Sequence, residues 1–253
     1  MEFDAKTEVN NIAKFVQDYY QEHNLAGAVL GLSGGKDSAV VLALLVRALG
    51  KDNVVALTLP CHSISEDKSL AEMVAEHFGV KCVNVDLSET FDSLTHAIKS
   101  GCEVNDSNLN NSNINLKPRL RTATLYYYAA MMSSLKNKPY IVIGTSNKCE
   151  LFVGYFTKGG DNVCDLSLIS DFTVEEVIKL GEELGVPSKV LYRAPSDGIS
   201  GISDEEKLGV TYREIASYID NPESVSKESR EKIEKLHSGS LHKFNLSAYR
   251  RNK

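Results

Sequence analysis

AVLGLSGGKDSAVVLALLVRALG, residues 28–50, predicts a buried strand, a turn with two glycines and a helix that ends at Gly50. The strand residues are apolar without alternation, as in a parallel strand that is covered on both faces. Residues 38–50 are apolar almost all round, which is typical of a helix packed between layers. The stretch therefore predicts the first strand–helix unit of a parallel α/β sheet.

The same alternation continues along the chain. Apolar runs predict further strands at residues 53–60, 80–87 and 139–146, and helical periodicity predicts helices at residues 7–23, 65–79, 88–101 and 118–136. Strands separated by helices imply right-handed parallel crossovers. We therefore expect a doubly wound parallel sheet with helices on both faces. We expect one domain over residues 1–253, with a helical C-terminal portion from about residue 204.

Two segments interrupt this pattern. Residues 103–117 are rich in asparagine and serine, which predicts a loop or a flap. Residues 241–253 carry several basic side chains without a helical face, and we expect this tail to be solvated.

Composition restricts the class of protein. The chain has 253 residues and a net charge of −6, whereas nucleic-acid binders usually have a basic surplus. No apolar run approaches ~18 residues, so we expect no membrane span, and the first residues do not have the pattern of a secretory signal. The five cysteines are odd in number and form no C-x-x-C pair. Reduced thiols in the cytoplasm are the expectation.

The turn at residues 33–38 has the features of an anion site. Glycines permit close backbone approach, and the start of a helix presents free N–H groups to a phosphate. The Walker A pattern fails because Asp37, and not a hydroxyl residue, follows Lys36. An acid beside phosphate is tolerated when a divalent cation lies between them, and Mg²⁺ binds through carboxylates and phosphate oxygens. The turn therefore predicts a magnesium–polyphosphate site with Asp37 as metal ligand; an ordinary glycine-rich turn is the alternative.

SGGKDS, residues 33–38, resembles the phosphate loop of the ATP pyrophosphatases, which cleave ATP between the α and β phosphates. Further motifs are similar to those of ammonia-dependent NAD synthetases. They are Asn115 with Arg119 and Arg121, GTSNKCE at 144–150, GYFTKGGD at 154–161 with the later Asp165, DEEKLGVTY at 204–212 and LHK at 241–243. The matches follow the family order from residue 31 to residue 243. Because they occupy the chain, we expect ammonium and not glutamine as the nitrogen source.

This resemblance implies an adenine nucleotide alpha hydrolase-like fold and a homodimer that converts deamido-NAD to NAD. ATP and ammonia are the co-substrates, and the reaction passes through an acyl-adenylate. The implied ATP-binding residues are Gly31, Leu32, Ser33, Gly34, Gly35, Lys36, Asp37, Ser38, Thr145 and Ser196. The implied magnesium ligands are Asp37 and Glu150, and the implied deamido-NAD residues are Arg119, Lys158, Asp165, His242 and Lys243. Asp161 corresponds to an acid that assists the attack of ammonia.

Physical chemistry supports part of this assignment independently. Glu150 follows a predicted strand end, where parallel sheets bind ligands, and a second acid there would complete a magnesium clamp. Lysine and arginine side chains suit an anionic dinucleotide. The alternatives are exposed side chains in the first turn of a helix for Arg119 and Arg121, a surface turn for Lys158 and Asp161, and a solvated acid at a helix start for Glu150. The tyrosines at 126–128 predict packing or a subunit interface.

The sequence departs from the family pattern at two positions. Phe244 stands where the family has an arginine, and Val174 stands where it usually has a lysine that reaches the ATP phosphates. Thr173 and Glu176 predict a capping box at this helix start, so the alignment holds. We hypothesise that Lys36, at a position that is often uncharged, supplies the missing charge; the alternative is that it points to solvent. The rival functions are another ATP pyrophosphatase, such as a tRNA-modifying enzyme or another amidotransferase synthetase, and a nucleotide-binding sensor without activity.

Overall fold

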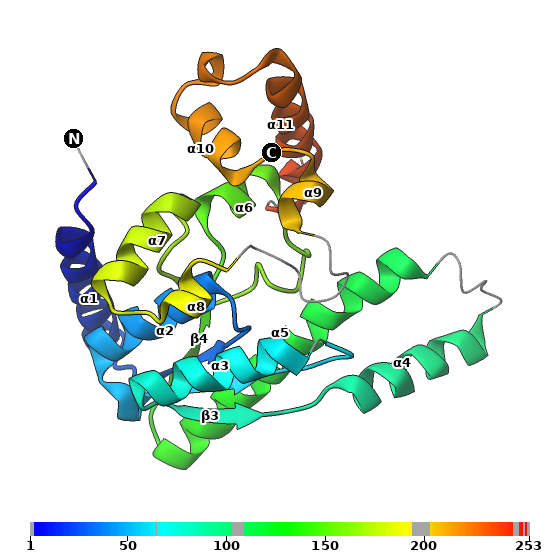
Figure 1. Ribbon diagram of the computed structural model, residues 1–253. Coiled ribbons are helices and arrows are strands. Elements are labelled where there is room, and N and C mark those ends of the chain that lie inside the picture. Colours follow the sequence, from blue (N-terminus) through cyan, green and yellow to red (C-terminus); the bar gives the residue numbers. More distant parts are fainter. Residues whose placement is uncertain are drawn as a thin grey trace.

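The protein is built on a five-stranded parallel sheet (Figure 1). The computed structural model describes residues 3–63, 65–102, 109–193, 203–244, 248–249 and 251. The strand order is β3-β2-β1-β4-β5. The strands are β1 (Gly27–Gly31), β2 (Val54–Thr58), β3 (Lys81–Asn84), β4 (Tyr140–Gly144) and β5 (Leu166–Ser167). The doubly wound parallel sheet expected from the sequence is confirmed, although the short β5 was not anticipated as a strand.

The chain changes direction across the sheet at β1. Val29 pairs with Val55 of β2 on one side and with Val142 of β4 on the other. The loops that follow β1 and β4 therefore leave the same edge of the sheet side by side. Such a switch point is where doubly wound sheets bind ligands.

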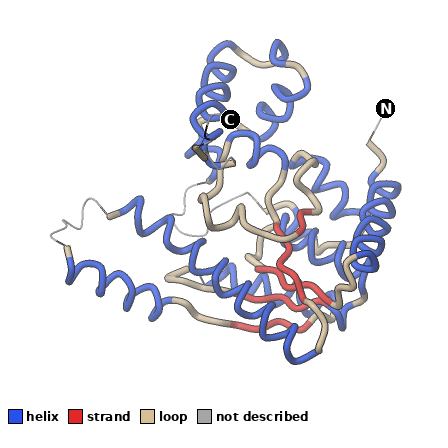
Figure 2. Tube along the Cα trace, turned by 180° about the vertical axis from the view of Figure 1, so that it is seen from behind, coloured by secondary structure: helices blue, strands red, loops and turns tan. Residues whose placement is uncertain are grey.

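Helices cover both faces of the sheet, as Figure 2 shows from behind. One face is covered by α1 (Ala5–Glu22), α2 (Lys36–Leu49), α3 (Ser65–Phe78), α7 (Val174–Glu183) and α8 (Ser188–Leu191). α2 lies in the centre of this layer, and its residues 39–45 are all buried, which explains why its sequence is apolar almost all round. The capping box predicted at α7 is confirmed, because Thr173 Oγ1 accepts from the Glu176 amide and Glu176 Oε2 accepts from the Thr173 amide.

The opposite face packs against α4 (Ser88–Gly101) and α5 (Asn110–Lys136). Both helices continue beyond the sheet and project together from the body (Figures 1 and 2). The predicted loop at 103–117 is wrong for residues 110–117, which form the first turns of α5; residues 103–108 lie outside the described residues. The polar composition is overridden because Leu116 packs against the buried cluster on this face and Asn115 Nδ2 donates to the Asn111 carbonyl.

A third buried cluster lies above the carboxyl edge of the sheet. It joins α6 (Lys148–Val153) to α10 (Tyr212–Asp220) and α11 (Lys227–Ser240). The short helix α9 (Asp204–Leu208) precedes them, and 3₁₀ turns occupy Lys51–Asn53, Pro222–Ser224 and Leu241–Lys243. The helical C-terminal portion is thus placed over the edge where β1 and β4 end.

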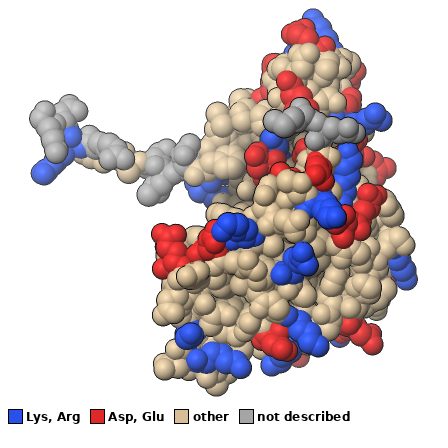
Figure 3. Space-filling view, turned by 90° about the vertical axis from the view of Figure 1, so that its left-hand side faces the viewer, with Lys and Arg blue, Asp and Glu red and all other residues tan. Residues whose placement is uncertain are grey.

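Acidic and basic side chains are interspersed on the face shown in Figure 3. Within the described ranges, none of the helices combines the length and the apolar character that crossing a bilayer requires. All five cysteines are free thiols.

Candidate active site

A pocket of about 590 Å³ opens at the carboxyl edge of the sheet, where the loops after β1 and β4 meet. Its wall is completed by α5, by the turn at 154–161 and by α9. Many of the residues singled out in the sequence line it: Gly31, Leu32, Ser33, Gly35, Lys36, Asp37, Thr145, Glu150, Asp161 and Lys243. The structure therefore brings together segments that are far apart in the sequence at a single site.

Six other predicted residues that the structure describes do not line the pocket. Gly34 and Ser38 shape the loop after β1. Lys158 belongs to the turn at 154–161 and is bonded to Arg119 and to the His242 carbonyl, whereas Asp165 lies beside β4. Ser196 falls outside the described residues. Arg121, which belongs to the same motif as Arg119, does line the pocket.

The loop after β1 is held open by its own hydrogen bonds. Ser38 Oγ accepts from the Ser33 amide at 3.2 Å and donates to the Gly35 carbonyl at 3.0 Å. Gly34 has φ +81°, and a Cβ there would lie 2.3 Å from the Asp67 carbonyl oxygen, so a side chain is excluded. No side chain of the described residues caps the start of α2. The N-terminal end of α2 therefore faces the pocket as an uncapped positive dipole.

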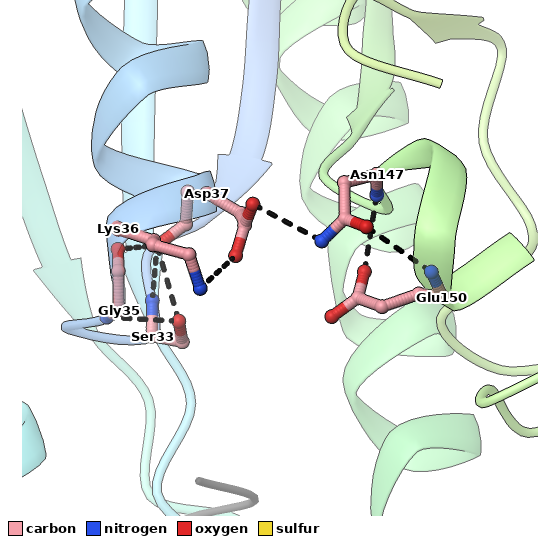
Figure 4. A network of polar contacts seen from close by, with 7 residues as sticks. Ser33, Gly35, Lys36, Asp37, Asn147 and Glu150 are labelled. Carbon is pink, nitrogen blue, oxygen red and sulfur yellow. Dashed lines mark hydrogen bonds and ion pairs between the residues drawn. The ribbon is translucent and has the colours of Figure 1, made fainter. Parts of the chain in front are cut away.

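Two acids face each other across the gap between this loop and α6 (Figure 4). Asn147 connects them: its Nδ2 donates to Asp37 Oδ1 at 3.3 Å, and its backbone amide donates to Glu150 Oε2 at 3.0 Å. Asn147 is fully buried and also caps α6, since its Oδ1 accepts from the Glu150 amide. The capping box therefore fixes Glu150 opposite Asp37.

The environment of Glu150 disfavours its ionised form. Desolvation raises the pKa of this carboxyl well above its usual value, and the negative charge of Asp37 raises the pKa further. Hydrogen bonding by Asn147 and the positive charge of Lys36 act in the opposite direction. The site is therefore short of positive charge when both carboxyls are ionised.

Lys36 does not point to solvent. Its side chain is 5% exposed, its Nζ lies 3.3 Å from Asp37 Oδ2, and it lies over the ring of Tyr212 at 6.0 Å. The alternative of a solvated Lys36 is therefore wrong. Val174 is half-buried and packs against the third cluster, and it is not among the pocket-lining residues.

α9 contributes Asp204 to the pocket wall, and Tyr212 of α10 lies next to Lys36 without lining the pocket. Neither residue was expected in the site from the sequence. Asp204 is buried and accepts from the Tyr155 hydroxyl at 3.0 Å. Its charge adds to those that raise the pKa of Glu150. The hydroxyl of Tyr212 is buried and has no hydrogen-bond partner among the described residues. Burial and the charge of Glu150 raise the pKa of Tyr212, so the phenol stays neutral.

The residues fit a magnesium ion that is shared with phosphate. No group of three or more histidine, cysteine or acidic side chains within the described ranges could hold a metal alone. Mg²⁺ in nucleotide sites, however, usually takes one or two carboxylates plus phosphate oxygens. Asp37 and Glu150 supply two carboxylates beside an uncapped helix start. The buried Tyr212 hydroxyl, which has no hydrogen-bond partner among the described residues, is close enough for the charges of both acids to act on it.

The cations predicted for the dinucleotide hold the turn at 154–161 in place. Lys243 Nζ donates to the carbonyls of Gly154 and Phe156 at 2.7 and 2.9 Å. Lys158 Nζ donates to the His242 carbonyl at 2.8 Å, and Arg119 Nε donates to the Lys158 carbonyl at 3.2 Å. The C-terminal LHK motif is thereby attached to the turn that carries Asp161.

Asp161 faces the pocket and accepts from the Thr157 amide at 3.2 Å. The surrounding walls desolvate its carboxylate and raise its pKa, while the charges of Arg121 and Lys243 lower it. A carboxylate with a raised pKa can take a proton more readily near neutral pH.

Asp165 connects two elements of the fold by hydrogen bonds. Its carboxylate accepts from the Val142 amide at 2.7 Å and from the Tyr126 hydroxyl at 3.1 Å, which ties β4 to α5. Burial raises the pKa of Tyr126 to about 12, with Asp165 as the next cause.

Other site residues were missed because their roles depend on contacts between segments that are far apart in the sequence. Asn147 stands in the quoted GTSNKCE stretch but had only the signature of a helix cap. Arg193 lines the pocket and donates to Asp67 at 2.7 Å; its sequence neighbours give no motif. Asp204 lay in the quoted DEEKLGVTY motif, yet its contact with Tyr155 depends on the packing of α9.

The chain resembles known proteins over nearly all of its length. The family model described as NAD synthase matches residues 8–247. The NH(3)-dependent NAD(+) synthetase of Carboxydothermus hydrogenoformans is 37% identical over 242 residues, which are 95% of each chain. The solved structure of NMN synthetase from Francisella tularensis has a TM-score of 0.88 and 31% identity, covering 99% of this chain and 100% of that one. An NH3-dependent NAD synthetase from Campylobacter jejuni, in complex with nitrate, has a TM-score of 0.78 and 24% identity, covering 98% of this chain and 100% of that one.

Proposed function

Because the chain belongs to the NAD synthase family, we propose that it joins ammonia to the nicotinic acid carboxyl group of deamido-NAD. The reaction consumes ATP and releases AMP and pyrophosphate. It is a ligase reaction that forms a carbon–nitrogen bond. The observation that carries the proposal is the pocket in which the uncapped start of α2, with Asp37, faces Glu150 of α6.

The ATP phosphates are assigned to the loop after β1. Residues 31–38 present the start of α2 to the triphosphate, and Thr145 at the end of β4 lies on the adjoining wall. The resemblance in sequence adds Ser196, which lies outside the described residues, as a proposed phosphate contact. Positioning and stabilisation of negative charge are the main contributions that a protein makes to phosphoryl chemistry.

Magnesium is assigned to Asp37 and Glu150. When bound, the ion supplies positive charge to the pyrophosphate leaving group. The chain contributes two carboxylates that Asn147 holds opposite each other. Asn147 is therefore a positioning residue for both proposed ligands.

The acid substrate is assigned to the wall formed by the turn at 154–161. The proposed dinucleotide region consists of Arg119, Lys158, Asp165, His242 and Lys243. Lys243 lies on the pocket surface, Arg119, Lys158 and His242 are bonded to one another beside it, and Asp165 lies beside β4. The substrate carboxylate attacks the α-phosphorus of ATP, and ammonia then displaces AMP from the acyl-adenylate. Asp161, with its raised pKa, takes the proton that ammonium must lose.

The direct test supplies the purified chain with ATP, Mg²⁺, deamido-NAD and ammonium, and measures NAD by mass spectrometry. NAD formation that needs all four additions is expected. Absence of NAD under these conditions, from protein with native circular dichroism, contradicts the proposal.

A mononucleotide is the second candidate substrate. It is favoured by the likeness to the Francisella protein, which is described as an NMN synthetase and covers the chain with 31% identity. The same pocket would then amidate nicotinic acid mononucleotide to NMN. Parallel assays with the two acids at equal concentration decide the matter: we expect a higher kcat/KM for deamido-NAD, and a preference for the mononucleotide replaces the first proposal by the second.

We further propose that the chain acts as a symmetric homodimer through α4 and α5. Large apolar side chains are exposed along these two helices: Leu94, Ile98, Ile114, Tyr127, Met131 and Leu135. Sedimentation at micromolar concentration should give twice the chain mass, and Leu135→Glu should reduce it. An active monomer contradicts this assembly.

Two remaining expectations are proposals of the same kind. Residues 1–253 act as a single domain, since α6 at the sheet edge shares a buried cluster with α10 and α11 of the C-terminal portion. A cytoplasmic location is supported by the five free thiols.

A further inference from the structure

Lys36 occupies an unusual position for a lysine. Its side chain is almost fully buried, and its Nζ is directed at the Asp37 carboxylate (Figure 4). A buried ammonium is costly unless an anion is near. Here the cost is offset by Asp37, and the face of the Tyr212 ring lies at 6.0 Å from the amino group. The side chain is therefore already engaged with one of the two proposed metal ligands.

The charges around this amino group are mostly negative. Asp37 and Glu150 face each other through Asn147, and Asp204 lies near enough for its charge to act on Glu150. The positive charge of Lys36 acts on Glu150 in the opposite direction. It therefore occupies, in electrostatic terms, the role that a metal ion between the two acids would take.

We propose that Lys36 is the resident counterion of the Asp37–Glu150 pair, so that a divalent cation binds there only together with the phosphates of the nucleotide. This inference rests on the magnesium and ATP assignments of the proposed function. A divalent ion alone must enter beside a buried ammonium and displace its ion pair with Asp37. Phosphate oxygens change this balance because they offer both the metal and Lys36 a new anionic partner.

The proposal gives Lys36 two effects of opposite sign. Without nucleotide, its charge weakens metal binding. With nucleotide, the same charge favours the triphosphate. A role as a phosphate ligand alone predicts only the second effect, so the affinity for metal in the absence of nucleotide separates the two roles.

The experiment titrates Mn²⁺ into nucleotide-free protein and follows free Mn²⁺ by electron paramagnetic resonance. Lys36→Met and Lys36→Leu remove the charge and keep an apolar stem. We expect both to bind Mn²⁺ about tenfold more tightly than the unaltered chain, and Lys36→Arg to bind it as weakly. Lys148→Met is the matched control, because Lys148 lies close to Glu150 in the sequence but pairs with Asp171 at 3.2 Å; it should leave the affinity unchanged.

Several results would overturn the proposal. One is unchanged Mn²⁺ affinity in folded Lys36→Met and Lys36→Leu, and another is an equal gain in Lys148→Met. If a neutral variant is unfolded alone, Mn²⁺ should restore its circular dichroism, since the ion replaces the missing counterion; failure of this rescue counts against the proposal. The titration involves no turnover. A chain that binds Mn²⁺ as expected but makes no NAD would refute the proposed function and leave the role of Lys36 standing.

Discussion

Glu150→Gln is expected to stabilise the ligand-free protein near neutral pH. The folded state raises the pKa of Glu150 above its unfolded value, so the stability that the protonated carboxyl provides is present below the unfolded pKa. It is lost as the pH rises through the folded pKa. Glutamine keeps an acceptor for the Asn147 amide, as capping boxes allow, and removes the charge that opposes Asp37. The gain in melting temperature should be small at acid pH and grow toward neutrality.

The same substitution should reverse the order of stability once Mg²⁺ and ATP are added. A ligand at 100 times its dissociation constant stabilises by about 2.7 kcal/mol, which raises the melting temperature of a chain of this size by about 5–10 °C. Loss of one charge-assisted contact costs about 1.5–3 kcal/mol, or one to two decades in affinity. At the same ligand concentration the variant should therefore gain only about 0.4–1.4 kcal/mol.

Calorimetric melting between acid and neutral pH, with and without Mg²⁺-ATP, checks both effects. Glu214→Gln is the matched control, because Glu214 closes an equivalent capping box with Thr211. Its pKa is lowered, chiefly by the hydrogen bond from Ser229. Its stabilising effect is therefore present above the unfolded pKa and is lost as the pH falls, so Glu214→Gln should destabilise at neutral pH. A ligand-free Glu150→Gln that melts below the unaltered chain at neutral pH refutes the reasoning, as does an undiminished shift with Mg²⁺-ATP.

Three further outcomes are expected. Lys36→Gln should raise the KM for ATP by one to two decades, because a contact of about 1.5–3 kcal/mol is lost. Adding Val174→Lys should recover part of this loss. An unchanged KM in Lys36→Gln would exclude the hypothesis that Lys36 replaces the family lysine. Asp161→Asn should lower kcat about 10²–10⁴-fold. The activity of the unaltered chain should decrease as the pH falls through the raised pKa of Asp161, because the protonated carboxyl cannot act as a base. A flat pH–rate profile argues against a base there. Gly34→Ala should cost more stability than Gly50→Ala. Both glycines have positive φ, which alone costs an alanine about 1–3 kcal/mol, but of the two only Gly34 would place a Cβ against a backbone oxygen, that of Asp67. Equal losses in the free energy of unfolding would show that this contact relaxes.

Much of the fold was predictable because the buried elements have strong local patterns. The apolar residues of α2, β1, β2 and β4 form runs that are stable only when buried, and the structure buries them. The two-residue β5 carried no such pattern, since its strand character comes from pairing with Ile143 and Gly144. The first turns of α5 were missed for a related reason: asparagine and serine favour loops locally, and packing of Leu116 decides the conformation.

The turn at 33–38 and its place beside a pocket were predictable because one continuous segment carries the glycines, the hydroxyls and the carboxylate. Glu150 could be anticipated from its place after a strand. The buried orientation of Lys36 could not, because it depends on Asp37 and on Tyr212 from a helix far along the chain. The same holds for Asp204, whose partner Tyr155 is contributed by another segment.

The acyl-adenylate is tested most directly by oxygen transfer. The substrate is deamido-NAD with ¹⁸O in both oxygens of the nicotinic acid carboxylate. It is converted with ATP, Mg²⁺ and ammonium, and mass spectrometry measures the ¹⁸O content of each product. Attack of the carboxylate on the α-phosphorus predicts one ¹⁸O in AMP, one in the amide of NAD and none in pyrophosphate. Unlabelled AMP, or ADP and labelled phosphate in its place, would contradict the account.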